Sequence, residues 1–263
     1  MIFIIGGRGF VGSAFARICE AKGKEYAIIT RQNYHEFIGK RCEIIIDANG
    51  NSKKFLAKEA PLQDFDASVR SVRSNLINFK YDCYVYLSSC DVYPDCSSPL
   101  ITSEDVKIDV SKQSPYGFHK YLAELCVQHA AKQWLIIRFG GFVGPGLKKN
   151  AIYDILNGGP LWLDPESELQ YMYTDHAAEI VLKLLDLGIT NEIFNICGRG
   201  VIKLQEVIKV VGGEIPVYPG SPYVRYEVNI DKISKLADIP ETRATVLEFV
   251  RAEMRRREEE RKL

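Results

Sequence analysis

The sequence predicts an α/β fold: a doubly wound parallel sheet with a small C-terminal lobe interleaved with it. Short β-branched, apolar runs alternate with helical stretches from the N-terminus to Ile196. Runs that are apolar throughout are typical of parallel strands covered by helices on both faces. From Gly140 onward, glycine and proline pairs break the chain into loops, which indicates a second and less regular part.

This alternation places the individual elements. Strands are expected at residues 1–5, 26–29, 43–47, 83–87, 135–138 and 193–196. Helices are expected between them at residues 12–22, 66–79, 116–132 and 175–187. The short gap between the second and third strands leaves room for one helical turn near Asn33–Ile38, but not for a further strand and helix. The end of the chain, 241–263, is expected to be a helix whose charged last turns face solvent.

The change from alternating strands and helices to loops rich in glycine and proline predicts two domains that are interleaved in sequence. The first takes residues 1–145 plus about 173–200 and contains all six expected strands. The second, smaller lobe takes about 146–172 and 201–263.

Composition excludes several classes of function. Lys+Arg and Asp+Glu are both 34, so there is no basic excess for nucleic acid or a membrane surface, and we expect neither partner. The seven cysteines are odd in number and form no CxxC pair, so neither a metal site nor a disulfide framework is expected. Reduced thiols are typical of a cytoplasmic protein. The apolar run Met1–Ile5 is too short for a signal peptide, and no run approaches the ~20 residues of a membrane span.

A glycine-rich turn joins the first strand to the first helix. Glycines leave no Cβ between the backbone and a phosphate, and the N-terminus of the following helix attracts negative charge. In this position the turn predicts a dinucleotide site, although an ordinary strand-to-helix turn remains the alternative. The expected cofactor contacts are Gly6, Arg8, Gly9, Phe10, Val11 and Gly12.

The end of the second strand favours NADP over NAD. An NAD site requires an acid here for the ribose 2′-hydroxyl, and none occurs between Glu25 and Glu36. Arg31 could pair with a 2′-phosphate, Thr30 could donate to it, and Arg8 would add charge. NAD stays the alternative, in which Arg31 only faces solvent.

Tyr116 and Lys120 open the helix expected at 116–132. They lie four residues apart, which is one helical turn, so their side chains share a face. A lysine ammonium beside a phenol favours the phenolate and lowers its pKa, which suits an acid/base role. The alternative is an ordinary surface pair. His119 would face another direction, and we expect no role for it.

Ser88 and Ser89 end the fourth strand, before Cys90 and Asp91. Ligands of open parallel sheets bind beyond the carboxyl ends of the strands. There the Ser89 hydroxyl can hydrogen-bond a carbonyl as hydride arrives, although a polar strand end is the alternative. Asp91 is a candidate acid or base, or simply a turn carboxylate, and Cys90 a small buried residue.

Together these motifs resemble the extended short-chain dehydrogenase/reductase family of NAD(P)-dependent sugar-nucleotide epimerases, dehydratases and reductases. The resemblance covers most of the chain. The glycine spacing, the serine motif ending in Ser89 and the Tyr116–Lys120 pair with Glu124 match the family's pattern. Three later segments look like further family motifs: 138–146 (RFGGFVGPG), 173–178 (YTDHAA) and 194–198 (FNICG).

The resemblance implies a Rossmann-type cofactor domain, a substrate-binding lobe and a homodimer formed through helices 66–79 and 116–132. It implies Tyr116 as general acid/base, Lys120 as the residue that binds the nicotinamide ribose, and Ser89 as the hydroxyl that polarises the carbonyl. Ala48 and Asn49 replace a His-Leu-Ala-Ala segment of the family, and we count both among the cofactor contacts. The implied substrate is a nucleotide sugar.

Departures from the family's pattern bear on the reaction. Family dehydratases place Asp-Glu where this chain has Cys90 and Asp91, so reduction of a keto-sugar carbonyl is favoured. An epimerase or dehydratase with a transient keto intermediate is the first alternative, and a non-catalytic dinucleotide-sensing scaffold is the second. The family commonly has an arginine near the position of Gln170 that binds the substrate diphosphate, and this chain lacks it. Arg225, or Lys148 and Lys149, could take its place. A substrate other than a sugar nucleotide therefore also stays open.

Overall fold

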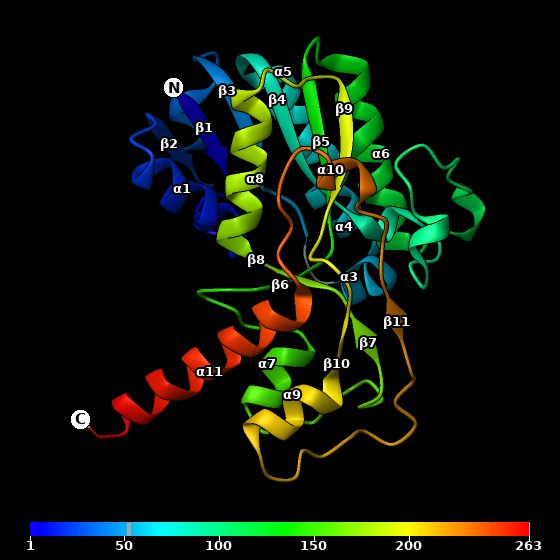
Figure 1. The fold of residues 1–263 in the computed structure, drawn as a ribbon. Helices are drawn as coiled ribbons and strands as arrows, with labels where there is room; N and C mark the ends of the chain where they lie inside the picture. Colours follow the sequence, from blue (N-terminus) through cyan, green and yellow to red (C-terminus); the bar gives the residue numbers. More distant parts are fainter. Residues whose placement is uncertain (52–53, 263) are drawn as a thin grey trace. The chain divides into compact units, whose positions relative to one another are not determined.

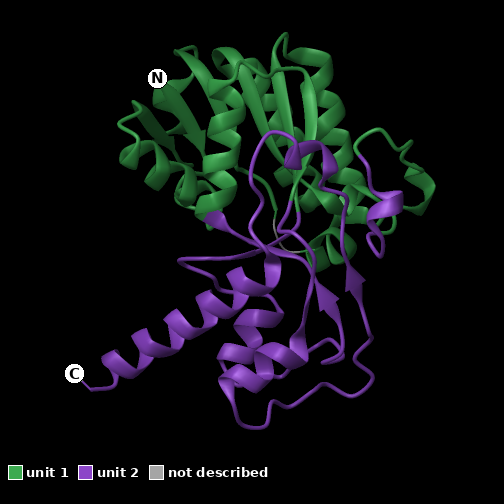
Figure 2. Cartoon of the chain, viewed as in Figure 1, with its two compact units in different colours: residues 1–95, 104–139, 175–196 green, residues 96–103, 140–174, 197–263 purple. Residues whose placement is uncertain are grey.

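The computed structural model describes residues 1–51 and 54–262, which form two units (Figures 1 and 2). Unit 1 takes residues 1–95, 104–139 and 175–196. Unit 2 takes residues 96–103, 140–174 and 197–263, so it includes a short excursion, 96–103, from within the first half of the chain.

Unit 1 contains a six-stranded parallel sheet in the order β2-β1-β3-β4-β5-β9 (Figure 1). The strands are β1 (Ile2–Ile5), β2 (Tyr26–Ile29), β3 (Arg41–Asp47), β4 (Lys80–Ser89), β5 (Trp134–Phe139) and β9 (Glu192–Ile196). The chain runs from β1 outward to β2 and then returns to β3 on the other side of β1. Winding therefore reverses between β1 and β3, which confirms the doubly wound prediction. In such sheets ligands bind beyond the strand ends at this reversal.

The helices of unit 1 follow the predicted alternation. They are α1 (Gly12–Ala21), α2 (Tyr34–Phe37), α3 (Lys54–Glu59), α4 (Pro61–Phe65), α5 (Ser71–Asn78), α6 (Pro115–Ala130) and α8 (Thr174–Asp186). A π-helical turn, η1 (Asp66–Arg70), joins α4 to α5, so the helix expected at 66–79 is entered through an irregular turn. Short 3₁₀ turns occur at η2 (Cys90–Val92), η3 (Pro99–Ile101) and η4 (Val110–Lys112).

The start of α6 shows how local sequence places a helix. The Ser114 side chain accepts a hydrogen bond from the backbone of Gly117 at 3.1 Å, and Pro115 occupies the first helical position. A serine cap followed by proline is a strong start signal because both suit the unpaired first turn. Farther along, Ala123 and Val127 pack into a core with Tyr84 of β4. Figure 1 shows α1 and α8 in front of the sheet.

Unit 2 is less regular. A parallel pair joins β6 (Gly141–Val143) to β8 (Tyr171–Tyr173), and a second small sheet has the order β10-β7-β11, with β7 (Glu168–Leu169), β10 (Ile202–Lys203) and β11 (Arg225–Tyr226). Its helices are α7 (Ala151–Leu156), α9 (Leu204–Val211), α10 (Asp231–Ser234) and α11 (Thr242–Glu260). Ile155, Val207 and Val250 are among the residues of its core. Of the helices that the structure describes, none is long and apolar enough to cross a membrane.

Candidate active site

The glycine turn lies at the reversal point of the sheet, between β1 and α1. Gly6 has φ +75°, and the Gly9 amide donates to the Gly6 carbonyl at 2.8 Å. A Cβ added to Gly12 would lie only 2.4 Å from that same carbonyl oxygen, so the tight turn requires glycine there. The closed turn leads directly into the ten-residue helix α1, whose N-terminus favours an anion. This cradle fits the pyrophosphate of a dinucleotide.

Two arginines border this cradle. Arg8 in the turn and Arg31 after β2 are both exposed. The Thr30 hydroxyl and amide both donate to the side-chain oxygen of Asn33, at 3.1 and 2.7 Å. A 2′-phosphate at this strand end would thus meet the Arg31 guanidinium, but would compete with Asn33 for the Thr30 hydroxyl.

The segment after β3 lies against the glycine turn. A Cβ added to Gly6 would be 3.0 Å from the carbonyl oxygen of Ala48, and the Asn49 amide donates to the Asp47 carboxylate at 3.0 Å. Ala48 and Asn49 therefore lie beside the cradle, at the edge of the sheet where a dinucleotide would pass.

The acid/base candidates gather beyond the carboxyl end of β4. Tyr116 and Lys120 are both buried on α6, and Ser89, the last residue of β4, is hydrogen-bonded to Tyr116. The Lys120 ammonium donates to the Leu87 carbonyl at 3.1 Å and lies 5.0 Å from the centre of the Tyr86 ring. Ser89, Tyr116 and Lys120 thus occupy one region of unit 1, as the sequence motifs predicted.

The electrostatics of this group correct one expectation. Burial raises the pKa of Tyr116, and the negative charges of Asp91 and Asp64 raise it further, while the hydrogen bond between Tyr116 and Ser89 lowers it. Burial also lowers the pKa of Lys120, against the pull of neighbouring acids. The prediction that Lys120 would lower the pKa of Tyr116 overall is therefore wrong for this structure, because burial and the nearby acids dominate. With a raised pKa the phenol holds its proton at neutral pH, and it is a candidate proton donor.

Asp91 makes contacts that the sequence did not reveal. Its carboxylate accepts a hydrogen bond from the Ser89 hydroxyl at 3.0 Å and lies 2.7 Å from the ammonium of Lys54. Lys54, in α3, is largely exposed, whereas only 15% of the Asp91 side chain is exposed. No sequence pattern linked Lys54 to β4, because the two come from different βα connections.

Gly117 controls how closely α6 approaches the end of β4. A Cβ at this position would lie 1.9 Å from the carbonyl oxygen of Asp91, far inside any allowed contact. The missing side chain lets the first turn of α6 rest on turn η2 and brings Tyr116 to Ser89. The feature of the sequence that could have indicated this close approach is a glycine within a helix, where glycine is otherwise unfavourable.

Several of the family-like motifs meet in one buried network beneath Ser89. Arg138 pairs with Glu124 through two hydrogen bonds, of 3.0 and 2.7 Å, and Glu124 also accepts the Ser88 hydroxyl at 2.6 Å. Arg138 donates to the Tyr93 hydroxyl at 2.9 Å, which in turn donates to Asn195 at 2.9 Å. The network thereby joins strands β5 and β9 and helix α6 to the end of β4.

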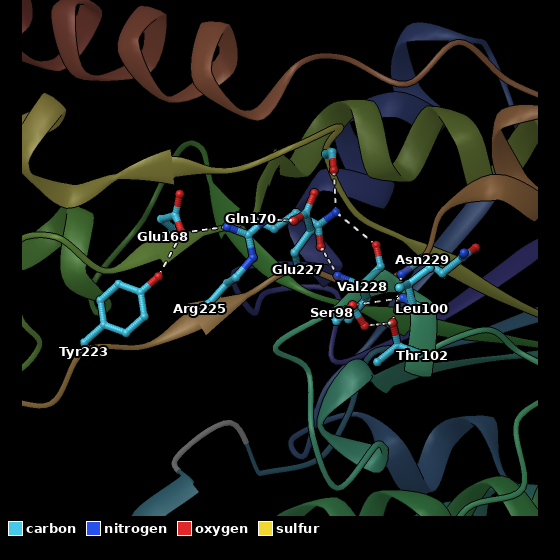
Figure 3. A network of polar contacts seen from close by, with 11 residues as sticks. Ser98, Leu100, Thr102, Glu168, Gln170, Tyr223, Arg225, Glu227, Val228 and Asn229 are labelled. Carbon is cyan, nitrogen blue, oxygen red and sulfur yellow. Dashed lines mark hydrogen bonds and ion pairs between the residues drawn. The ribbon is translucent and has the colours of Figure 1, made fainter.

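Unit 2 contains Arg225, one of the residues that could replace the missing diphosphate-binding arginine, and Gln170, near which that arginine is missing (Figure 3). Arg225 pairs with Glu168 at 2.6 Å and also with Glu227. Gln170 is buried, donating to the Gly198 carbonyl at 2.7 Å and accepting from the backbone of Val228 at 2.9 Å. Because two carboxylates already flank Arg225, its charge is neutralised within the unit, which argues against a role in gripping phosphate.

Comparison with known proteins adds to this geometry. A model of the NAD dependent epimerase/dehydratase family matches residues 2–197. No curated protein matches the sequence. A crystal structure of UDP-galactose 4-epimerase is similar, with TM-score 0.78 and 19% identity, covering 97% of this chain and 99% of that one.

Two further solved structures have a similar fold. A dTDP-4-dehydrorhamnose reductase from Clostridium acetobutylicum has TM-score 0.78 and 16% identity, covering 96% of this chain and 99% of that one. RMD from Pseudomonas aeruginosa, solved with NADPH, has TM-score 0.75 and 17% identity, covering 96% and 98%. At these identities the structures show a shared fold, and the fold is common to an epimerase and a reductase.

Proposed function

Because the chain belongs to the NAD-dependent epimerase/dehydratase family, whose enzymes use NAD or NADP, we propose that it reduces the carbonyl of a nucleotide-activated keto-sugar. One observation carries the choice of chemistry. A buried, protonated Tyr116 is hydrogen-bonded to Ser89 at the carboxyl end of β4, with Lys120 one turn along the same helix. A scaffold without catalytic function would not need to bury these three polar side chains together.

The residues of the site have separate roles in this proposal. Bound NAD(P)H would supply the hydride to the carbonyl carbon. The Ser89 hydroxyl, which donates to Asp91 in this structure, would turn to donate to the carbonyl oxygen and hold it in place. Tyr116 transfers its phenolic proton to that oxygen as the alcohol forms, and is then reprotonated from solvent. Lys120 retains two donor protons beyond its bond to Leu87, which suit the hydroxyls of a ribose.

Asp91 distinguishes reduction from the alternatives. Epimerisation by removal of a carbon-bound proton, or loss of water, needs a further base besides Tyr116, whereas epimerisation through a transient keto intermediate formed by hydride transfer does not. Asp91 is the candidate, and its carboxylate is already engaged by Lys54 and by Ser89. This favours reduction, while an epimerase or dehydratase that releases Asp91 on binding substrate is the second candidate.

We propose NADP as the preferred cofactor, supported by the exposed guanidinium groups of Arg8 and Arg31 and by the absence of an acid between Glu25 and Glu36. NAD remains the alternative. A homodimer is proposed through the surface of η1, α5 and α6 together with the end of α4, where Phe65, Val69, Leu122 and Leu125 line a groove and Phe65 and Leu125 are exposed. Native mass spectrometry of the purified protein tests both cofactor and dimer.

The decisive test of the reaction is a panel of nucleoside-diphosphate 4-keto-sugars incubated with the protein and NADPH. Stoichiometric loss of NADPH absorbance, with an alcohol product, is expected. Product formation without net NADPH loss would favour an epimerase or dehydratase. A parallel panel of keto substrates that lack a diphosphate is the comparison, and oxidation of NADPH with that panel alone would show that the substrate is not a sugar nucleotide.

A further inference from the structure

Asp64 is a buried acid near the candidate site that no step of the reaction uses. It lies in α4 and is fully buried. Its carboxylate contacts His119 of α6 at 2.6 Å, accepts from the side chain of Asn51 at 2.6 Å, and accepts from the Ser68 hydroxyl at 3.3 Å. Donors from three different elements thus compensate the burial of one carboxylate. His119, for which the sequence suggested no role, is one of them.

The contact between Asn51 and Asp64 is important because Asn51 is the last residue of segment 48–51. Residues 48–51 follow β3 and run along the edge of the sheet. At one end, a Cβ on Gly6 would lie 3.0 Å from the Ala48 carbonyl, and at the other, a Cβ on Gly50 would lie 3.5 Å from the Lys120 ammonium. The segment therefore connects the glycine cradle to the catalytic lysine, along the path that a dinucleotide would take.

Both ends of this segment are anchored to buried acids. At its start the Asn49 amide donates to Asp47, which is fully buried. At its end the Asn51 side chain bonds Asp64, and the Asn51 amide donates to Ser68 at 3.4 Å. The second anchor also holds α6 through His119, the residue next to Lys120.

We propose that Asp64 is a positioning residue, which holds segment 48–51 against α6 through Asn51 and His119 and so keeps the cofactor-facing edge in its binding arrangement. The inference rests on the proposed function only in taking the ligand to be NAD(P). A segment that is competent for a fraction of the time binds its ligand more weakly in proportion to that fraction.

Two further observations support a functional role over simple packing. An apolar side chain at position 64 would join α4 to α6 without the penalty of burying a carboxylate, so the acid is better explained by what it fixes. The π-helical turn η1 begins two residues after Asp64 and contains Ser68, the third donor. Such turns are frequent at functional sites.

The test combines cofactor binding with hydrogen exchange. Asn51→Ala removes the hydrogen bond between segment 48–51 and Asp64, and leaves Asp64 paired with His119. We expect the NADPH dissociation constant to rise about tenfold, equivalent to about 1.4 kcal/mol. Amide exchange across 49–51 should accelerate in the protein without added cofactor. Adding Asp64→Asn to Asn51→Ala should weaken binding by less than the sum of the two single effects.

Thr242→Val is the matched control, because Thr242 is also fully buried and bonds the backbone of Tyr171, but lies in unit 2. It should lower the unfolding midpoint without changing NADPH affinity or exchange at 49–51. Unchanged affinity and exchange in folded Asn51→Ala, or equal changes in Thr242→Val, would overturn the proposal. If the wild-type protein bound neither NADPH nor NADH, the proposed function would fall, and the exchange data alone would decide whether Asp64 holds the segment.

Discussion

Replacing Gly117 by alanine should disable the site through geometry alone. The added Cβ would lie 1.9 Å from the Asp91 carbonyl oxygen, where real Cβ contacts are essentially never below 3.0 Å. The first turn of α6 must therefore move away from turn η2 by at least about 1 Å, and Tyr116 moves with it. A misplacement of about 1 Å can reduce turnover by about 100-fold.

The same substitution should lower the stability of the protein. In a helix without this contact, alanine would be more stable than glycine by about 1 kcal/mol. Forcing an atom into packed surroundings instead costs about 1–3 kcal/mol, so the midpoint of thermal unfolding should fall. The assay pairs keto-sugar reduction, followed by NADPH absorbance, with thermal unfolding. Gln128→Ala, at an exposed position of the same helix, should leave both near wild type. A Gly117→Ala protein with full turnover and a raised midpoint would refute the close approach.

Three further substitutions test other parts of the site. Tyr116→Phe should lower turnover by about 100- to 10,000-fold, while the affinity for NADPH, measured by titration calorimetry, stays near that of the wild type. Undiminished turnover would show that Tyr116 is not the proton donor. Arg31→Leu should weaken NADP⁺ binding by about 10-fold or more through the loss of a charge-assisted contact, with NAD⁺ binding unchanged; equal effects on both would show that Arg31 only faces solvent. Glu124→Gln should lower the free energy of unfolding by about 3–5 kcal/mol, because the buried charge of Arg138 would lose its partner. A change below about 1 kcal/mol, measured by urea unfolding, would contradict that account.

The elements that the sequence predicted well are those set by local patterns. The expected strand 26–29 agrees with β2, and the expected helix at 12–22 differs from α1 by one residue at its end. Apolar runs and start signals such as Ser114–Pro115 act over a few residues, so they can be recognised without the tertiary structure. The convergence of Ser89 with Tyr116 was also predictable, because parallel strands place their carboxyl ends at one edge.

The features that were missed depend on contacts between residues far apart in the chain. Lys54 meets Asp91, and His119 meets Asp64, across packed elements whose mutual distance no periodicity encodes. The direction of the Tyr116 pKa was wrong for the same reason. Spacing showed the lysine one turn away, but not the burial or the two acids that outweigh it. Arg225 likewise looked available until its pairs with Glu168 and Glu227 were seen.

These contacts suggest why the site tolerates so many buried charges. Lys120 lies among Asp47, Glu124, Asp64 and Asp91, all of which raise its pKa against the effect of burial. Three of those four acids also hold a structural element: Asp47 the start of segment 48–51, Asp64 its end, and Glu124 the strand β5 through Arg138. Two of the acids that oppose the effect of burial on the pKa of Lys120, Asp47 and Asp64, thus also anchor the segment along which the cofactor would lie. A substitution at either of them should therefore change cofactor affinity and the titration of Lys120 together, whereas a purely structural anchor would change stability alone.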